Sequence, residues 1–177
     1  MTVGPAEERQ FFLIALDRPG SGLYNNGSRT ESCVIKEDVM SKYLDRAREL
    51  RAIAVPHCNC GQAVVVPFAE DAGLTEAQAM GICANFGGGL KRASACGAVT
   101  GGLVVLGLFG IDNPAEYYQA LREAHEGMLD CADLLRRNRE LGGEKKPHCD
   151  ALVYECVELA ERILRERGLM NCESTEG

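Results

Sequence analysis

The sequence predicts an all-α protein, a compact bundle of five to seven helices with one buried glycine-rich helix. Apolar residues recur at helical spacing in two long segments, from about residue 36 to 50 and from about residue 147 to 167. Residues that favour helix starts, such as Asn59, Thr75 and Pro147, stand directly before helical patterns. The composition is 46% hydrophobic and 25% charged, which is typical of a globular protein with a core.

The first three expected helices lie between residues 36 and 85. In the first, the apolar positions that recur one turn apart are Val39, Tyr43, Ala47 and Leu50. A second helix begins near Asn59, and Pro67 is expected to kink it or to end its first part, because proline lacks a backbone N–H. A third follows Thr75, with Gln78 at the spacing of a capping box.

The central segment from Ser94 to Gly110 is apolar and rich in glycine. Its β-branched Val104 and Val105 also fit a buried strand. A buried helix is the preferred interpretation, because its glycines let neighbouring backbones approach closely and so offset their low helix propensity. The segment Phe86–Leu90 before it supplies glycines that adopt positive φ, which suits a helix end.

Three more helices are expected after the central segment. One begins with Pro114 at its first position and ends near Gly127, and a short one follows Asp130. After a linker over residues 141–147, Pro147 is expected to open a final helix that runs through Arg167. Residues 1–32 are rich in loop-forming residues and are interpreted as a leader, which leaves 33–177 as a single helical domain.

Charge and hydrophobicity exclude several classes of partner and frame the nine cysteines. The net charge of -7 and the pI near 5.1 argue against nucleic acid, because phosphate binding needs a basic face. No apolar run approaches the ~18 residues that a membrane span requires, so no membrane insertion is expected and the chain is interpreted as cytoplasmic. In a reducing compartment, many cysteines indicate metal, cluster or redox chemistry more often than structural disulfides.

Four cysteines fall at expected helix starts. Asn59, Ser94 and Asp130 are good N-cap residues, and Pro147 favours a first helical position. The cysteines that follow them within the first helical turn are Cys60, Cys96, Cys131 and Cys149. Free N–H groups and the helix dipole stabilise a thiolate there, which is the form that binds metal. A single cysteine at such a place is usually a small buried hydrophobe. Four of them predict a Cys₄ site, provided that tertiary structure brings the four helix ends together.

The other cysteines and the histidines carry weaker expectations. Cys58 and Cys156 are possible additional ligands, although core packing is favoured for Cys156, which lies two turns after Cys149. Cys83 is expected in the core, and Cys33 and Cys172 have no assigned role. His57 and His148 each precede a cysteine, but capping or solvation is favoured over metal binding, and His125 is placed near a helix C-terminus. The segment FGGGLKR lacks the spacing of a phosphate-binding loop.

Several segments together resemble a known family. NCGQAVVVPFAEDAGL, FGGGLKRASACGAVTGGLVVLGL, Cys131 before ADLL, and KKPHCDALV are similar to the redox-active protein family C_GCAxxG_C_C, over roughly Tyr43 to Arg165. Its hallmark is four cysteines, which match Cys60, Cys96, Cys131 and Cys149. Gly61 departs from the usual alanine after the first cysteine. The family also resembles the non-haem portion of split-Soret cytochrome c, a dimeric protein with an iron–sulfur centre, which implies an iron–sulfur role and a homodimer here.

Three functions follow as hypotheses. The first is a redox protein that binds an iron–sulfur cluster through the four cysteines, for electron transfer with an unknown redox partner protein or for redox sensing. The second is a metal-free thiol–disulfide protein with Cys58 and Cys60 as its pair, a tight spacing that strains a disulfide. The third is a structural or binding protein with zinc in the Cys₄ site. No C-x-x-C-H motif is present, so covalent c-type haem is excluded. The sequence assigns no reaction and no substrate.

Overall fold

The computed structural model describes residues 41–55 and 57–170, and within these ranges the fold is all-α, as predicted. Its seven α-helices are α1 Lys42–Ala52, α2 Cys60–Val65, α3 Glu76–Ile82, α4 Gly97–Leu108, α5 Ala115–Ala124, α6 Cys131–Glu140 and α7 Lys145–Glu166. A 3₁₀ helix, Val66–Phe68, follows α2, and a π-helical turn, Gly89–Ala93, precedes α4. The predictions made for the leader, Val39, Cys33 and Cys172 lie outside the described residues.

Local capping explains where the first helices begin. Asn59 and Gln62 form a reciprocal capping box at the start of α2, and Thr75 and Gln78 form another at α3, as predicted. The prediction for Pro67 is also confirmed, because α2 ends at Val65 and the 3₁₀ helix that follows contains this proline.

The helix α4 is the glycine-rich centre of the fold, and its helical rather than extended form is confirmed. It packs against α2 and α7. A Cβ atom at Gly101 would lie 3.0 Å from the Cβ of Val64 on α2, and a Cβ at Gly102 would overlap the hydroxyl of Tyr117 on α5. These two glycines therefore allow the close packing of the bundle. The face of α4 with Leu103, Val104 and Leu108 is only partly buried.

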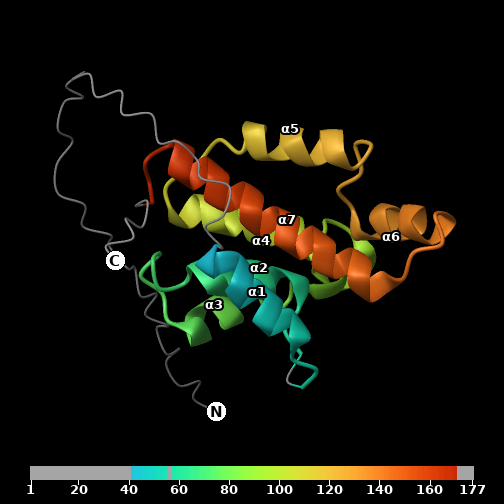
Figure 1. Ribbon diagram of the computed structural model, residues 1–177, viewed down its shortest axis with the longest axis horizontal. Coiled ribbons are helices and arrows are strands. Elements are labelled where there is room, and N and C mark those ends of the chain that lie inside the picture. Colours follow the sequence, from blue (N-terminus) through green and yellow to red (C-terminus); the bar gives the residue numbers. More distant parts are fainter. Residues whose placement is uncertain (1–40, 56, 171–177) are drawn as a thin grey trace, which may run out of the picture. The chain divides into compact units, whose positions relative to one another are not determined.

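The long helix α7 crosses the bundle in front of α4, with α1, α2 and α3 on one side of it and α5 on the other (Figure 1). The start of α7 lies beside α6 (Figure 1). It begins at Lys145 after the N-cap Glu144, so the prediction that Pro147 takes the first position is wrong. Proline is tolerated anywhere in the first turn, because the N–H groups there have no partner within the helix.

A short crossing of two backbone segments joins the starts of α4 and α6. The Cys96 N–H donates to the Leu129 carbonyl at 3.0 Å, and the Cys131 N–H donates to the Ser94 carbonyl at 2.8 Å. This bridge keeps Ser94 out of the helix, so its predicted N-cap role is wrong and Cys96 is the N-cap of α4. Pro114 is likewise the N-cap of α5 and not its first residue.

The segment before α4 has a left-handed backbone over four consecutive residues. The φ values of Gly88, Gly89, Leu90 and Lys91 are 61°, 62°, 55° and 61°. The predicted positive φ of the glycines is thus confirmed, although α3 already ends at Ile82 and the glycines open the π-helical turn. The two non-glycine residues each cost about 1–2 kcal/mol in this conformation.

Candidate cysteine site

A pocket of about 620 Å³ gathers the four cysteines that the sequence singles out. The side chains that line it together with glycine backbone are Arg51, His57, Asn59, Cys60, Lys91, Cys96, Cys131, Lys145, Lys146, Cys149 and Leu152. The glycines are Gly87, Gly88, Gly89 and Gly97. Four separate helices therefore bring their cysteines to one cavity.

Helix starts bring three of these cysteines to the pocket. Cys60 and Cys131 are the first residues of α2 and α6, as predicted, and Cys96 is the N-cap of α4. Cys149 is the exception, because it is the fifth residue of α7 rather than about the third. The partial positive charge of a helix N-terminus acts mainly within the first turn, so Cys149 benefits from it less than expected.

Cys60 and Cys149 form a coupled pair across α2 and α7. The Cys149 thiol donates a hydrogen bond to the Cys60 sulfur, which lowers the pKa of Cys60 despite its partial burial. The same hydrogen bond raises the pKa of Cys149. Arg51 also lowers the pKa of Cys60 through its positive charge. In the metal-free protein the first thiolate of the pocket is therefore Cys60.

The other two sulfurs stay protonated more readily. Burial raises the pKa of Cys96 to about 11, although the backbone amides of Val99 and Ala98 oppose this shift. Burial also raises the pKa of Cys131, and the negative charge of Cys60 adds to it. Because the charge of one thiolate disfavours the next, several thiolates coexist in this pocket only with a cation or a positively charged centre between them.

Glycines make room for the cysteine-bearing segments to meet. A Cβ at Gly89 would lie 2.6 Å from the Cβ of Cys131, and a Cβ at Gly97 would lie 3.4 Å from the Cβ of Cys60. A Cβ at Gly61 would lie 2.8 Å from the Cβ of Phe86, so the departure from alanine at this position relieves a contact. The donor set of four cysteines in a glycine-lined cavity fits an iron–sulfur cluster.

The spacing of the sulfurs differs from that of a single-ion site. Among residues 41–55 and 57–170, no group of three or more His, Cys, Asp or Glu side chains is arranged closely enough to hold one metal ion. A mononuclear zinc site needs four ligand atoms within about 2.3 Å of one centre.

The remaining described cysteines do not line the pocket. Cys58 is buried, and its sulfur lies 3.9 Å from the sulfur of Met80, so it does not face the pocket with Cys60. Cys83 is fully buried at the end of α3, as predicted. Cys156 is also fully buried and pairs with the hydroxyl of Tyr117, which makes it a core residue.

The three histidines separate into different roles. His57 lines the pocket from its exposed rim. His148 does not line it, and its Nε2 is buried without a hydrogen-bond partner among the described residues. His125 caps the end of α5, as predicted, and its Nε2 lies 2.7 Å from a carboxylate oxygen of Glu155, a hydrogen bond that raises the pKa of His125.

Sequence reasoning missed the cationic side chains of the pocket. Lys91, Lys145 and Lys146 line it together with Arg51. The two lysines directly before the PHC triplet were a usable signal, because residues that precede a site cysteine in the same helix turn lie near it. No local signal marks Arg51, which reaches the pocket from the far end of α1.

Arg51 is held in place by bonds to two other segments. Its Nε donates to Asp150 at 2.6 Å, and its Nη1 donates to the Cys58 carbonyl at 2.8 Å. Its side chain is only 4% exposed. Since Asp150 follows Cys149 and Cys58 lies close to Cys60, Arg51 fixes the positions of the segments that carry the coupled pair.

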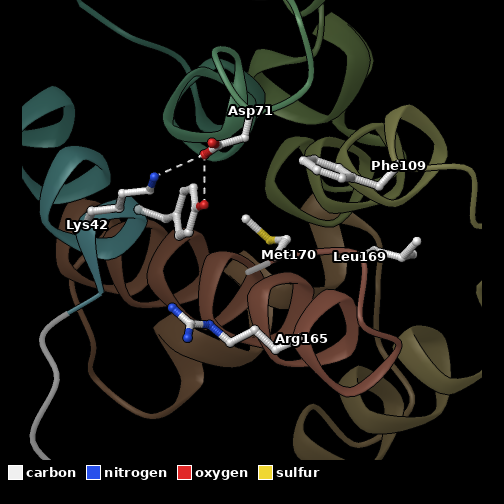
Figure 2. A pocket seen from close by; sticks show the side chains of 7 residues that line it. Lys42, Asp71, Phe109, Arg165, Leu169 and Met170 are labelled. Atoms are coloured by element: carbon white, nitrogen blue, oxygen red, sulfur yellow. Dashed lines mark hydrogen bonds and ion pairs between the residues drawn. The ribbon is translucent and has the colours of Figure 1, made fainter. Parts of the chain in front are cut away.

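A second pocket of about 310 Å³ has a different character and shares no lining residue with the first. Its carboxylate, Asp71, accepts a hydrogen bond from the Tyr43 hydroxyl at 2.7 Å and forms an ion pair with Lys42 at 3.3 Å (Figure 2). Phe109, Arg165, Leu169 and Met170 line the rest of the pocket (Figure 2). With no cysteine in its lining, this pocket takes no part in the thiol site.

Comparison with known proteins agrees with the arrangement of the cysteines. Among the described residues, no helix has both the length and the apolar character needed to cross a bilayer. No match was found among curated proteins or among solved structures. A family model, described as "Putative redox-active protein (C_GCAxxG_C_C)", matches residues 58–163, a range that contains all four pocket cysteines. This protein therefore belongs to the C_GCAxxG_C_C family of redox-active proteins.

Proposed function

We propose that this protein holds an iron–sulfur cluster through Cys60, Cys96, Cys131 and Cys149 and uses it to carry electrons or to sense redox state. The observation that carries the proposal is that these four cysteines, from four separate helices, line one pocket of about 620 Å³. Four cysteine thiolates are the usual ligand set of such clusters. When bound, the cluster supplies reversible one-electron chemistry.

The protein's own residues prepare the site for a negatively charged centre. Arg51 lines the pocket with positive charge, and the N-termini of α4 and α6, which have no side-chain cap, lie at the same pocket. Positive charge and N–H groups near the sulfurs stabilise the reduced, more negative state and thereby tune a reduction potential. The glycine lining leaves space that side chains would otherwise fill.

Anaerobic purification and reconstitution of the full chain test the proposal. We expect a brown protein that contains iron and acid-labile sulfide, and substitution of any one of the four cysteines by alanine lowers its iron content. Cys58→Ala and Cys83→Ala are matched controls, because both cysteines are buried outside the pocket. A colourless, iron-free protein, or an equal loss of iron in the controls, contradicts the proposal.

The contact between Cys60 and Cys149 supports a second candidate, a metal-free thiol–disulfide function. In this reaction the Cys60 thiolate attacks a substrate disulfide, and Cys149 then resolves the mixed disulfide. The substrate leaves as two thiols and the protein retains the Cys60–Cys149 disulfide. The pair named from the sequence, Cys58 and Cys60, has no such support, because Cys58 faces Met80. Elemental analysis of one anaerobic preparation separates iron, zinc and metal-free thiols.

A further inference from the structure

The charge of the cysteine pocket is opposite to that of the chain. The chain has 26 acidic and 19 basic residues, yet no Asp or Glu is among the described residues that line this pocket. Four cationic side chains line it, namely Arg51, Lys91, Lys145 and Lys146. A concave site with charges of one sign concentrates ions of the opposite sign.

The nearby carboxylate does not neutralise this charge. Asp150 accepts a hydrogen bond from Arg51 at 2.6 Å and another from Lys146 at 2.6 Å, so one negative charge serves two cations. Lys91 and Lys145 form no ion pair with any side chain in the described part of the chain. The pocket therefore keeps net positive charge, and two of its ammonium groups have no carboxylate partner there.

Arg51 keeps one guanidinium nitrogen, Nη2, for a ligand. Its Nε and Nη1 are bonded to Asp150 and to the Cys58 carbonyl, whereas its Nη2 makes no hydrogen bond with a described residue. The side chain is 96% buried, since only 4% of it is exposed, and it lines the pocket. A buried guanidinium with an unused N–H group is a strong recognition element for phosphate or carboxylate oxygens.

The left-handed segment before α4 brings a second cation to the same place. Leu90, Lys91 and Ala93 all have positive φ, an arrangement that side chains disfavour. Leu90 is exposed, so packing of its side chain does not compensate for the strain. Strained backbone of this kind is found at functional sites. Here it places Lys91 in the pocket lining beside the backbone of Gly87–Gly89.

We propose that the mouth of the cysteine pocket binds a small anionic molecule, with its phosphate or carboxylate group held by Arg51, Lys91 and Lys145 next to the sulfurs. The pocket volume of about 620 Å³ lies within the range of small-molecule sites. Binding depends on the cations and not on a cluster. The role of the anion, as a reactant or modulator of a redox centre, rests on the proposed function.

Two alkylating reagents that differ in charge report on the site in the full-length, metal-free, reduced protein. Iodoacetate is anionic and iodoacetamide is neutral, and peptide mass spectrometry gives the rate of each at Cys131, which lines the same pocket as Lys91 and Lys145. We expect the ratio of the iodoacetate rate to the iodoacetamide rate at Cys131 to be higher than the same ratio measured with a small thiol. We further expect inorganic phosphate or malonate to slow the iodoacetate reaction saturably, whereas sodium chloride at equal ionic strength does not.

Charge-removing variants give the control. Lys91→Gln and Lys145→Gln are expected to weaken protection by phosphate about tenfold. Arg162→Gln removes one exposed positive charge outside the pocket and should leave protection unchanged. Preference for phosphate over malonate, or the reverse, identifies which oxyanion the site recognises. Absence of saturable protection by either anion, or equal effects of the Lys91 and Arg162 variants, overturns the proposal.

Reconstitution with iron and protection by phosphate together separate the anion site from the iron–sulfur proposal. If reconstitution yields no iron but phosphate protection persists, the anion site stands and the cluster proposal fails. A second outcome is that iron and sulfide are incorporated, but phosphate does not protect the metal-free protein and does not shift the visible spectrum of the loaded protein. In that case the anion site fails and the cluster proposal stands.

Discussion

The thiol of Cys149 on α7 donates a hydrogen bond to the sulfur of Cys60 on α2. This contact makes one sulfur a better nucleophile and the other a proton holder, so the two thiols titrate as a pair. The contact joins two thiols that are far apart in the sequence, whereas the sulfur of Cys58, only two residues from Cys60, lies beside the sulfur of Met80.

The first prediction concerns this pair in the metal-free protein. Cys149→Ala removes the hydrogen bond that lowers the pKa of Cys60, so the rate of Cys60 alkylation at neutral pH should fall and its pH profile should move up toward the ordinary range. Mass spectrometry after timed iodoacetamide labelling measures it. Cys83→Ala is the control, and an unchanged Cys60 profile in Cys149→Ala would show that the two sulfurs are not coupled.

A pair of neighbouring glycines tests the packing of the site. Gly88 and Gly89 have φ values of 61° and 62°, so alanine has a similar backbone cost at each. A Cβ at Gly89 would lie 2.6 Å from the Cβ of Cys131, whereas a Cβ at Gly88 meets nothing within 4 Å. We expect Gly89→Ala to be less stable than Gly88→Ala by about 1–3 kcal/mol in urea unfolding. Equal stabilities would contradict the packing described here.

Alanine substitutions at two glycines of α4 are expected to have opposite effects on the stability of the protein. A Cβ at Gly102 would overlap the Tyr117 hydroxyl, so Gly102→Ala should destabilise the protein by at least about 1–3 kcal/mol. Gly107 is on the same helix and has open space around it, so Gly107→Ala should stabilise the helix by up to about 1 kcal/mol. Thermal unfolding followed by circular dichroism compares the two. A stabilising Gly102→Ala would disprove the contact between α4 and α5.

The pair of His125 and Glu155 gives stability a defined pH dependence. Because the hydrogen bond to Glu155 raises the pKa of His125 in the folded state, its stabilisation is fully present below the unfolded pKa and is lost as pH rises through the higher folded pKa. His125→Gln should therefore destabilise the protein at pH 5–6 by less than about 1 kcal/mol and have little effect above pH 8. His57→Gln, at an exposed residue, serves as the control. A larger destabilisation by His125→Gln at high pH than at low pH would contradict the raised pKa of folded His125.

Assembly as a homodimer remains a prediction. Among the glycines of α4, Gly101 and Gly102 pack against other segments of the chain, whereas Gly107 has open space around it that a second copy could approach. On the same helix, Leu103 and Val104 form a partly buried apolar face, and such a face is suited to a protein–protein interface. Light scattering at micromolar concentration should give a dimer mass for the intact chain. A monomer mass would rule the dimer out, and a chain that begins at Ser32 reports the contribution of the leader.

The fold was predictable where the signals are local. Capping boxes involve residues three positions apart, so Asn59 and Thr75 identify the starts of their helices without any knowledge of the rest. The starts of α4 and α7 were placed wrongly for physical reasons. A backbone bridge to a distant segment moves the start of α4 from Ser94 to Cys96, and proline is as acceptable at the third position of α7 as at its first.

The gathering of the four cysteines in one pocket was predictable, whereas the positive charges of that pocket were not. The four cysteines follow from helix-start positions and from the family pattern, both of which are properties of short segments. Arg51 acts at the pocket because its Nε is bonded to Asp150, a residue on another helix. Such a pairing is visible only after the chain has folded, since nothing in the sequence near Arg51 differs from a solvated helix end.

Because α7 supplies Cys149, the pocket remains incomplete until α7 has left the ribosome. A nascent chain that ends before α7 has three of the cysteines but lacks Asp150, so Arg51 has no carboxylate to hold it over the site. Domains of this size fold as units once their chain has emerged. A ligand that needs all four cysteines of the pocket can therefore bind only after α7 has been synthesised.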